Sequence, residues 1–239
     1  MSQRGQFAPD VPAQPSRDFA AAFRITPDSA WRVPANENAR PSRLQPAAKR
    51  VLDLAIALPA LMLCAPLLAA LALIVRLDSH GPAFFRQTRL GLGGKPFDIF
   101  KFRTMTVMEN GDAVEQAKEN DCRITRCGRW LRKTSLDELP QLLNVITGEM
   151  SLVGPRPHAR AHDRHYGQLI VNYDLRQAVK PGITGWAQVN GHRGETPTLD
   201  AMRARVDLDI WYVKNCSLAL DLAILMQTPL AVLLGRNAH

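Results

Sequence analysis

The sequence predicts an α+β protein in which a membrane-associated helix–break–helix segment precedes a small globular domain. Two observations lead to this prediction. From Leu54 to Val75, 22 residues pass without a charge, and about 20 apolar residues suffice for a helix to cross a bilayer. Beyond Arg76 the pattern changes to short segments with the two-residue period of strands, separated by glycine-rich turns, as in a globular domain.

The apolar segment has features that favour a hairpin over a straight span. Pro66 stands in its middle, where it removes a backbone donor and clashes with the carbonyl four residues earlier, so the helix should bend or break there. Basic residues flank both ends: Arg43, Lys49 and Arg50 before it, and Arg76, Arg86, Arg89 and Lys95 after it. Because basic flanks favour the cytoplasmic side, both ends are expected there, as in a re-entrant hairpin that dips into one leaflet. The alternative is an ordinary kinked span.

The first 46 residues differ in composition from the rest of the chain. They hold seven of the 17 prolines and show no sustained apolar period, which predicts a disordered N-terminal tail over residues 1–46. The expected boundaries are therefore residues 47–77 for the re-entrant membrane hairpin and residues 78–239 for the domain that follows it.

Composition narrows the choice of partners. The net charge of +8 and the isoelectric point near 9.7 suit an anionic partner such as nucleic acid, an acidic membrane surface or a phosphorylated substrate. A nucleic-acid binder is disfavoured, because the chain lacks interleaved aromatic and basic residues and spends 22 residues on membrane material. The four cysteines have no CxxC spacing, which is typical of reduced thiols.

The stretch GPAFFRQTRLGLGGKPFDIFKFRTM predicts two short strands around a glycine-rich turn. By the two-residue period of a strand, Lys101 and Arg103 would lie on one side of the second strand. The glycines do not form a phosphate-binding loop of the P-loop type, because that motif needs glycine where Arg89 stands and serine or threonine where Pro96 stands.

Two acids stand side by side in a basic surrounding, Asp137 and Glu138. Basic residues crowd them from both directions: Arg126, Arg129, Arg132 and Lys133 upstream, and Arg156 downstream. Such cations could grip a phosphate while a carboxylate attacks it, and adjacent carboxylates suit Mg²⁺ held together with substrate phosphates. The alternative is a capping box, in which Ser135 caps a helix and Glu138 reaches back to it. The two interpretations are compatible.

Several segments in unbroken order resemble the bacterial sugar transferase family, the small monotopic phosphoglycosyl transferases. The segments are KRVLDLAIALPALML, GPAFFRQTRLGLGGKPFDIFKFRTM, LRKTSLDELPQLLNVITGEMSLVGPRP, VKPGITGWAQVNGHRGET and LDIWYVKNCSLALDLAILMQT. The resemblance implies a re-entrant helix broken at a proline, followed by a small α/β catalytic domain with interfacial amphipathic helices. The family's break is usually Ser-Pro, whereas this chain has Ala65-Pro66.

The resemblance also implies an activity. Members of the family transfer a sugar-1-phosphate from a UDP-sugar to a polyprenyl (undecaprenyl) phosphate with release of UMP, which initiates the assembly of exopolysaccharide, capsule or O-antigen repeat units. The segment around Arg193-Gly194-Glu195-Thr196 is more similar to the glucose-1-phosphate branch, with UDP-galactose as the first alternative. A non-catalytic basic membrane scaffold is the rival from another class. Oligomeric state is left open.

Carried over position by position, the resemblance makes Asp137 the nucleophile that receives the phosphosugar and Glu138 its partner at Mg²⁺, so both are expected as catalytic and metal-binding residues. The expected substrate-binding residues are Arg132, Pro155, Arg156, Pro157, Lys101, Arg103, Gln188 and Asn190. The family lies at the inner (cytoplasmic) membrane, so the catalytic domain and both termini are expected to face the cytoplasm.

The C-terminal stretch LALDLAILMQTPLAVLLGR is interrupted by Asp221, Gln227 and Pro229. These interruptions predict an interfacial or packed helix pair in place of a membrane span.

Overall fold

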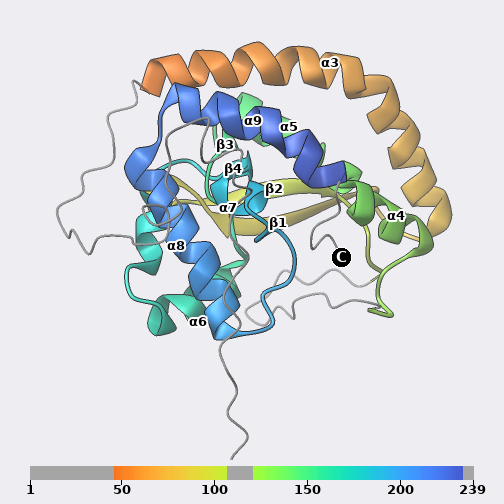
Figure 1. The fold of residues 1–239 in the computed structure, drawn as a ribbon. Coiled ribbons are helices and arrows are strands. Elements are labelled where there is room, and N and C mark those ends of the chain that lie inside the picture. Colours follow the sequence, from red (N-terminus) through yellow and green to blue (C-terminus); the bar gives the residue numbers. More distant parts are fainter. Residues whose placement is uncertain (1–45, 107–120, 234–239) are drawn as a thin grey trace, which may run out of the picture. The chain divides into compact units, whose positions relative to one another are not determined.

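The computed structural model describes residues 46–106 and 121–233, so nearly all of the predicted N-terminal tail lies outside the described residues. The described chain mixes helices and strands, which confirms the α+β prediction (Figure 1). The elements are, in chain order, α3 (Pro46–Asp78), β1 (Phe84–Leu90), η1 (Leu92–Gly94), β2 (Pro96–Phe102), α4 (Arg126–Thr134), η2 (Leu136–Glu138), α5 (Gln141–Thr147), β3 (Ser151–Val153), α6 (Arg160–Leu169), η3 (Tyr173–Ala178), β4 (Gly182–Thr184), α7 (Trp186–Val189), α8 (Leu199–Asn215) and α9 (Leu218–Leu233).

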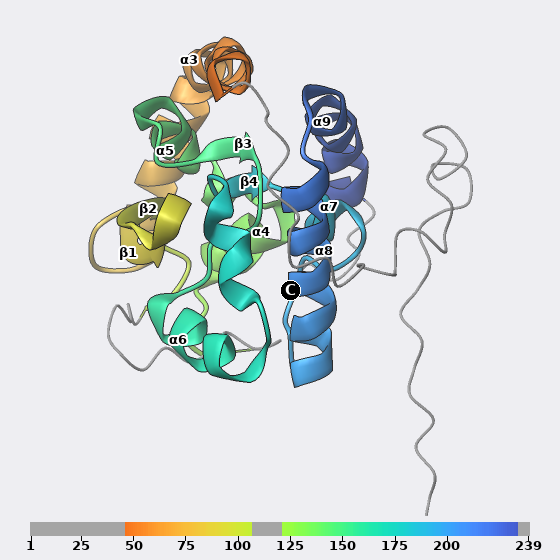
Figure 2. The same ribbon diagram turned by 90° about the vertical axis from the view of Figure 1, so that its left-hand side faces the viewer.

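Helix α3 carries the apolar segment. It is one continuous helix that contains Pro59 and Pro66 and bends along its length, in place of two helices separated by a break (Figures 1 and 2). A proline without a donor bends a helix without having to end it when the neighbouring turns keep their bonds. Among the described helices, α3 alone is long and apolar enough to cross a membrane by length and composition. Its large apolar side chains, such as Met62 and Leu63, are mostly exposed, which is consistent with membrane association.

The first turns of α3 are attached to the rest of the protein by charged side chains. Lys49 lies 2.5 Å from the buried carboxylate of Asp221 on α9. Arg50 donates to the carbonyls of Val145 and Ile146 at the end of α5, over 2.5 and 2.6 Å. A cation at the C-terminus of a helix satisfies carbonyls that have no partner inside the helix.

Asp53, one turn further along α3, is buried. It accepts hydrogen bonds from the Ser151 hydroxyl at 2.9 Å and from the Leu152 amide at 3.0 Å, both on β3. A buried carboxylate is stable in a fold only when such donors replace water. The N-terminal part of α3 therefore has a defined seat on the domain.

Arg103 secures the other end of α3. Its guanidinium donates to the carbonyls of Val75 at 3.2 Å and Ser79 at 2.5 Å, and also to that of His80. Arg103 lies one residue beyond β2, which ends at Phe102, although the Arg103 amide still donates to the Ala83 carbonyl at 2.9 Å. The Arg103 side chain is therefore a buried cap for the end of α3.

Strands β1 and β2 form the expected antiparallel hairpin, with Phe84 opposite Phe102 and Leu90 opposite Pro96. Gly93 and Gly94 adopt positive φ angles of 65° and 73° in the turn, a conformation that glycine reaches at little cost. Asn144 of α5 closes the edge of β2 that faces away from β1: its side-chain oxygen accepts from the Phe100 amide at 3.0 Å, and its amide donates to the Asp98 carbonyl at 2.7 Å.

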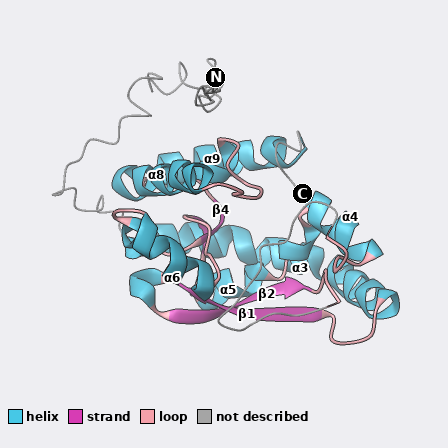
Figure 3. Ribbon diagram, turned by 90° about the horizontal axis from the view of Figure 1, so that it is seen from below, coloured by secondary structure: helices cyan, strands magenta, loops and turns pink. Residues whose placement is uncertain are grey.

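A second, parallel pair of strands lies deeper in the domain. Ser151 pairs with Gly182 and Val153 pairs with Thr184, which joins β3 to β4. Figure 3 shows the β1–β2 hairpin along one side of the domain and α8 and α9 along the opposite side, with α5 and β4 between them. The acidic pair lies on η2, the 3₁₀ turn that directly precedes α5 in the chain.

The C-terminal stretch forms a single helix, α9, so the expected helix pair is wrong. Pro229 lies inside α9, and Asp221 is fully buried against Lys49. Helix α9 exposes apolar side chains along its outer face instead: Leu222, Met226 and Leu230. A helix that buries its acid and exposes leucines is suited to an apolar surrounding.

Arg103→Met should destabilise the protein, because the carbonyls that end α3 lose their donors while staying partly buried. We expect a loss of about 2–3 kcal/mol, or a fall in Tm of roughly 5–10 °C for a domain of this size, measured by thermal unfolding in detergent. Arg86→Met is the matched control. Arg86 is exposed and packs over the Phe100 ring at 4.9 Å, so equal losses for the two variants would contradict the capping role.

Candidate active site

The backbone around Ser135 sets the position of the acidic pair. Helix α4 ends at Thr134, and Ser135 takes the left-handed conformation, with φ 59° and ψ 18°, before the short 3₁₀ turn η2. Its amide donates to the Arg132 carbonyl at 3.1 Å, so Ser135 closes α4. The capping-box hypothesis is therefore wrong: the Ser135 side chain makes no capping bond to η2, and Glu138 points elsewhere. Both acids are presented on a tight turn with Pro140 after it.

Glu138 is held by two cations from different parts of the chain. Lys101 of β2 donates a hydrogen bond to its carboxylate at 2.9 Å. Arg156 donates to both carboxylate oxygens, to one of them at 2.9 Å. Burial alone would raise the pKa of Glu138, but the charges of Arg156 and Lys101 outweigh burial and hold this pKa well below its usual value. Glu138 therefore stays ionised and fixed in place. The structure thus brings together Lys101, Glu138 and Arg156, which the sequence predicted as site residues from separate segments.

The Pro155–Pro157 turn aims Arg156 at Glu138. Each of its three carbonyls accepts a hydrogen bond from another segment: the first from the Gly182 amide at 3.0 Å, the second from Arg176 at 2.5 Å and the third from Arg89 at 3.1 Å. Prolines restrict the turn further, because their φ angles are fixed. Pro155 and Pro157 thus shape the site through the backbone.

Asp137 differs from its neighbour. Its side chain is buried, and within residues 46–106 and 121–233 it forms no ion pair at 4 Å or less. Burial, and then the charge of Glu138, raise the pKa of Asp137 to about 6. The cations Lys101, Arg132 and Arg156 keep this pKa from rising further. At pH 7 the carboxylate is therefore mostly ionised, desolvated and available to react.

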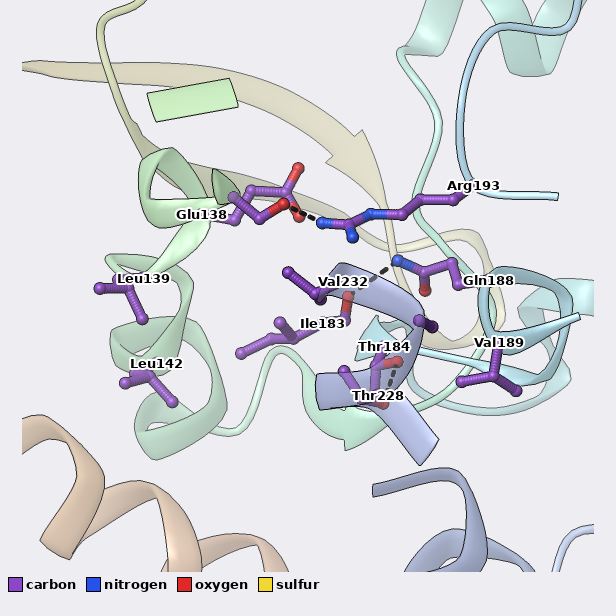
Figure 4. A pocket seen from close by; sticks show the side chains of 12 residues that line it. Glu138, Leu139, Leu142, Ile183, Thr184, Gln188, Val189, Arg193, Thr228 and Val232 are labelled. Atoms are coloured by element: carbon purple, nitrogen blue, oxygen red, sulfur yellow. Dashed lines mark hydrogen bonds between the residues drawn. The ribbon is translucent and has the colours of Figure 1, made fainter. Parts of the chain in front are cut away.

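A pocket opens beside Glu138, between η2, α5, the β4–α7 segment and the end of α9 (Figure 4). It is lined by Ser135, Glu138, Leu139, Leu142, Ile183, Thr184, Gln188, Val189, Arg193, Thr228, Ala231 and Val232. Most of this lining is apolar, and Glu138 and Arg193 lie together at one end of it. The acidic pair thus has a cavity next to it that is large enough to admit part of a ligand.

The expected residues Gln188 and Asn190 have different places. Gln188 lines the pocket; its amide donates to the Ile183 carbonyl at 3.2 Å, and its buried oxygen has no hydrogen-bond partner in the described part of the protein. Asn190 donates to the Trp186 carbonyl at 2.8 Å and so stabilises the end of α7. Gln188 has a group to offer a ligand, whereas the Asn190 amide is used by the fold.

Sequence reasoning missed several arginines of the site. Arg89, which the sequence suggested as a flank of the membrane segment, is half-buried and supports the Pro155–Pro157 turn. Desolvation and then the charge of Arg156 lower its pKa to about 10. Arg176 has a buried ion pair with Asp209 at 2.7 Å. Only the alternation of β1, which separates Arg86 from Arg89, could have marked Arg89 as inward-facing. No sequence pattern marks Arg176.

The sequence is similar to those of known proteins. Residues 44–235 match the family described as bacterial sugar transferase. A UDP-glucose:undecaprenyl-phosphate glucose-1-phosphate transferase of Escherichia coli K12 is 52% identical over 191 residues, which cover 80% of this chain and 41% of that protein. The protein of the same name from Caulobacter vibrioides is 53% identical over 191 residues, covering 80% of this chain and 72% of that protein.

A relative with another sugar in its name is also similar. The UDP-N-acetylgalactosamine-undecaprenyl-phosphate N-acetylgalactosaminephosphotransferase of Aeromonas hydrophila is 40% identical over 199 residues, which cover 83% of this chain and 47% of that protein. The chain spans about two fifths of the length of the E. coli relative. The matched region holds every element from α3 to α9, and the chain belongs to the bacterial sugar transferase family.

Proposed function

We propose that the chain transfers a sugar-1-phosphate, with glucose as the favoured sugar, from a UDP-sugar to a polyprenyl phosphate and releases UMP. The observation that carries the proposal is the buried Asp137 carboxylate, unpaired among described residues and surrounded by cations. Such a group can attack a phosphorus whose oxygens those cations hold. The names of the E. coli and Caulobacter relatives support glucose, and the Aeromonas relative shows that the family also uses other sugars.

The reaction would take two steps. An Asp137 oxygen attacks the phosphorus that bears the sugar; the new phosphorus–oxygen bond forms as the diphosphate bond breaks, and UMP departs with the electron pair. A phosphate oxygen of the lipid then attacks the same phosphorus, and Asp137 leaves as a free carboxylate. In our proposal Glu138 keeps Lys101 and Arg156 beside the reacting phosphate, where their charges stabilise its oxygens.

A Mg²⁺ ion is part of the proposal. Asp137, free of ion pairs among the described residues, fits such an ion together with diphosphate oxygens, which are hard oxygen ligands. Glu138 fits it less well, because both of its oxygens already accept hydrogen bonds from cations. Bound Mg²⁺ would supply charge that polarises the phosphates. Lys101 and Arg156 orient Glu138 whether or not the ion is bound.

We further propose that α3 enters one leaflet and returns, so that both of its ends face the cytoplasm at the inner membrane. Support comes from its bend, from the exposed apolar side chains along it, and from the basic residues at both ends, Lys49, Arg50 and Arg76. The exposed Leu222, Met226 and Leu230 of α9 would lie at the same membrane surface.

Asp137→Asn should abolish turnover, because an amide is a very poor nucleophile. Wild-type protein incubated with UDP-glucose and Mg²⁺, without lipid, should gain one hexose-phosphate of mass on the peptide that contains Asp137. Glu138→Gln is the companion variant; it should form this adduct more slowly. A panel of UDP-sugars in the same assay tests which sugar the protein prefers. Faster labelling by UDP-galactose would contradict glucose as the favoured sugar. An Asp137→Asn protein with wild-type turnover would exclude the two-step scheme.

The pKa of Asp137, about 6, predicts a pH dependence. Adduct formation should fall about tenfold per pH unit below 6, because the protonated carboxyl does not attack, and should level off above it. The pKa of Asp137 is higher in the folded state than in the unfolded state. The stability that its protonation contributes is therefore fully present below about pH 3.8 and is lost as the pH rises through about 6. At pH 8, Asp137→Asn should therefore raise the free energy of unfolding, by on the order of 1–3 kcal/mol, measured by denaturant titration.

Single engineered cysteines, in a variant without the four native ones, test the topology. One cysteine placed in residues 30–45 and another in residues 80–95 should both react with a membrane-impermeant thiol reagent only after cells are opened, because the basic flanks hold both ends inside. Pro66→Leu should straighten α3 and move one end across. Labelling of the N-terminal site in intact wild-type cells would contradict the hairpin.

A further inference from the structure

We propose that the pocket beside Glu138 binds the first isoprene units of the lipid acceptor, and that Arg193 binds the acceptor's phosphate. The inference rests on the proposed function and adds to it a place for the second substrate. It assigns a role to the end of α9, and it gives Arg193 a role beyond the choice of sugar with which the sequence interpretation connected its segment.

The walls of the pocket suit a branched hydrocarbon. Their apolar part comes from four segments of the chain: Leu139, Leu142, Ile183, Val189, Ala231 and Val232. Three hydroxyls line the pocket: those of Thr184 and Thr228 are paired with each other at 2.8 Å, and that of Ser135 accepts from Arg193. Gln188 adds one buried oxygen without a partner among the described residues. A uracil or a sugar would need several polar partners in such a cavity, whereas an isoprene unit needs none and gains from leaving water.

The polar end of the pocket suits a phosphate. Arg193 is half-buried and donates to the Ser135 hydroxyl. In the part of the chain that the structure describes, Arg193 has no carboxylate within 4 Å, because the nearby Glu138 is already taken by Lys101 and Arg156. A guanidinium without an acidic partner, at the mouth of an apolar cavity, fits a monophosphate attached to a hydrocarbon.

The pocket is oriented towards the apolar helices. Figure 4 shows Glu138 and Arg193 at one end, with Leu142 and Thr228 at the other, nearer the pale orange ribbon of α3. Helix α9 supplies one wall, and its outer face exposes Leu222, Met226 and Leu230. A lipid whose tail stays in the bilayer can therefore place its first units in the pocket and its phosphate beside Asp137, whereas a water-soluble UDP-sugar has no need of this route.

Filling the pocket tests the inference. Ala231→Phe and Val232→Trp put bulk into the wall formed by α9, and Met226→Trp adds the same bulk to its outer face as a matched control. We expect the two pocket variants to raise the KM for polyprenyl phosphate by about tenfold or more, with adduct formation from UDP-glucose within about twofold of wild type, since that step needs no lipid. Met226→Trp should leave both quantities unchanged.

Arg193 is tested by the same two assays. Arg193→Met should raise the KM for the acceptor, and Arg193→Lys should recover part of the loss, because a lysine keeps the charge but not the fork of donors. Among short acceptors, farnesyl phosphate should be used, because its first isoprene units can enter the pocket, whereas methyl phosphate should not be. Circular dichroism and Tm confirm that each variant is folded.

The outcomes separate the inference from the function on which it rests. If the pocket variants raised the KM for UDP-glucose and slowed adduct formation while the acceptor KM stayed constant, the pocket would belong to the donor and the inference would be overturned. Equal use of methyl phosphate and farnesyl phosphate would overturn it as well. If wild-type protein formed no adduct at all, the proposed function would fail first, and that result is visible before any lipid is added.

Discussion

The pairing of Glu138 with Lys101 and Arg156 is the interaction on which the site depends. It joins the hairpin, the 3₁₀ turn and the loop after β3, three segments that share no continuous sheet. One carboxylate between two cations leaves an excess of positive charge, which attracts phosphates. It also leaves Asp137 without a cation of its own among the described residues, and burial then gives that carboxylate its unusual proton affinity. Two adjacent residues of the same chemistry thus acquire different roles from their contacts.

The seat of α3 explains how a largely uncovered apolar helix stays in register with the domain. Lys49, Arg50 and Asp53 form a short polar surface on its first turns, and each finds a partner on a different element: α9, the end of α5 and β3. Buried polar contacts of this kind tolerate little displacement, because an unpaired charge in the interior is unfavourable. Any movement of the first turns of α3 relative to the domain would therefore displace the segments that surround the acidic pair.

The sequence predicted the features that local pattern controls and missed those that depend on distant contacts. The hairpin followed from alternation around Leu92–Gly94, and the acidic pair followed from its motif. The capping box failed because Ser135 takes a left-handed conformation that no local pattern marks. The capping role of Arg103 was missed because its contacts with His80 and Val75 join residues 23 and 28 positions apart. The contacts of Arg193 and Arg176 join residues far apart in the chain, and periodicity carries no information about such pairs.

Asn144 has a consequence for how the protein behaves towards other chains. By satisfying the amide of Phe100 and the carbonyl of Asp98, one side chain takes the place of a third strand. An open strand edge is a template on which a second molecule can pair, and exposed edges beside apolar surfaces promote aggregation. The sheet stops growing at β2 because this amide is both donor and acceptor at once. The protein exposes much apolar surface on α3 and α9. Because Asn144 occupies the outer edge of β2, a second copy of the chain cannot add a strand there.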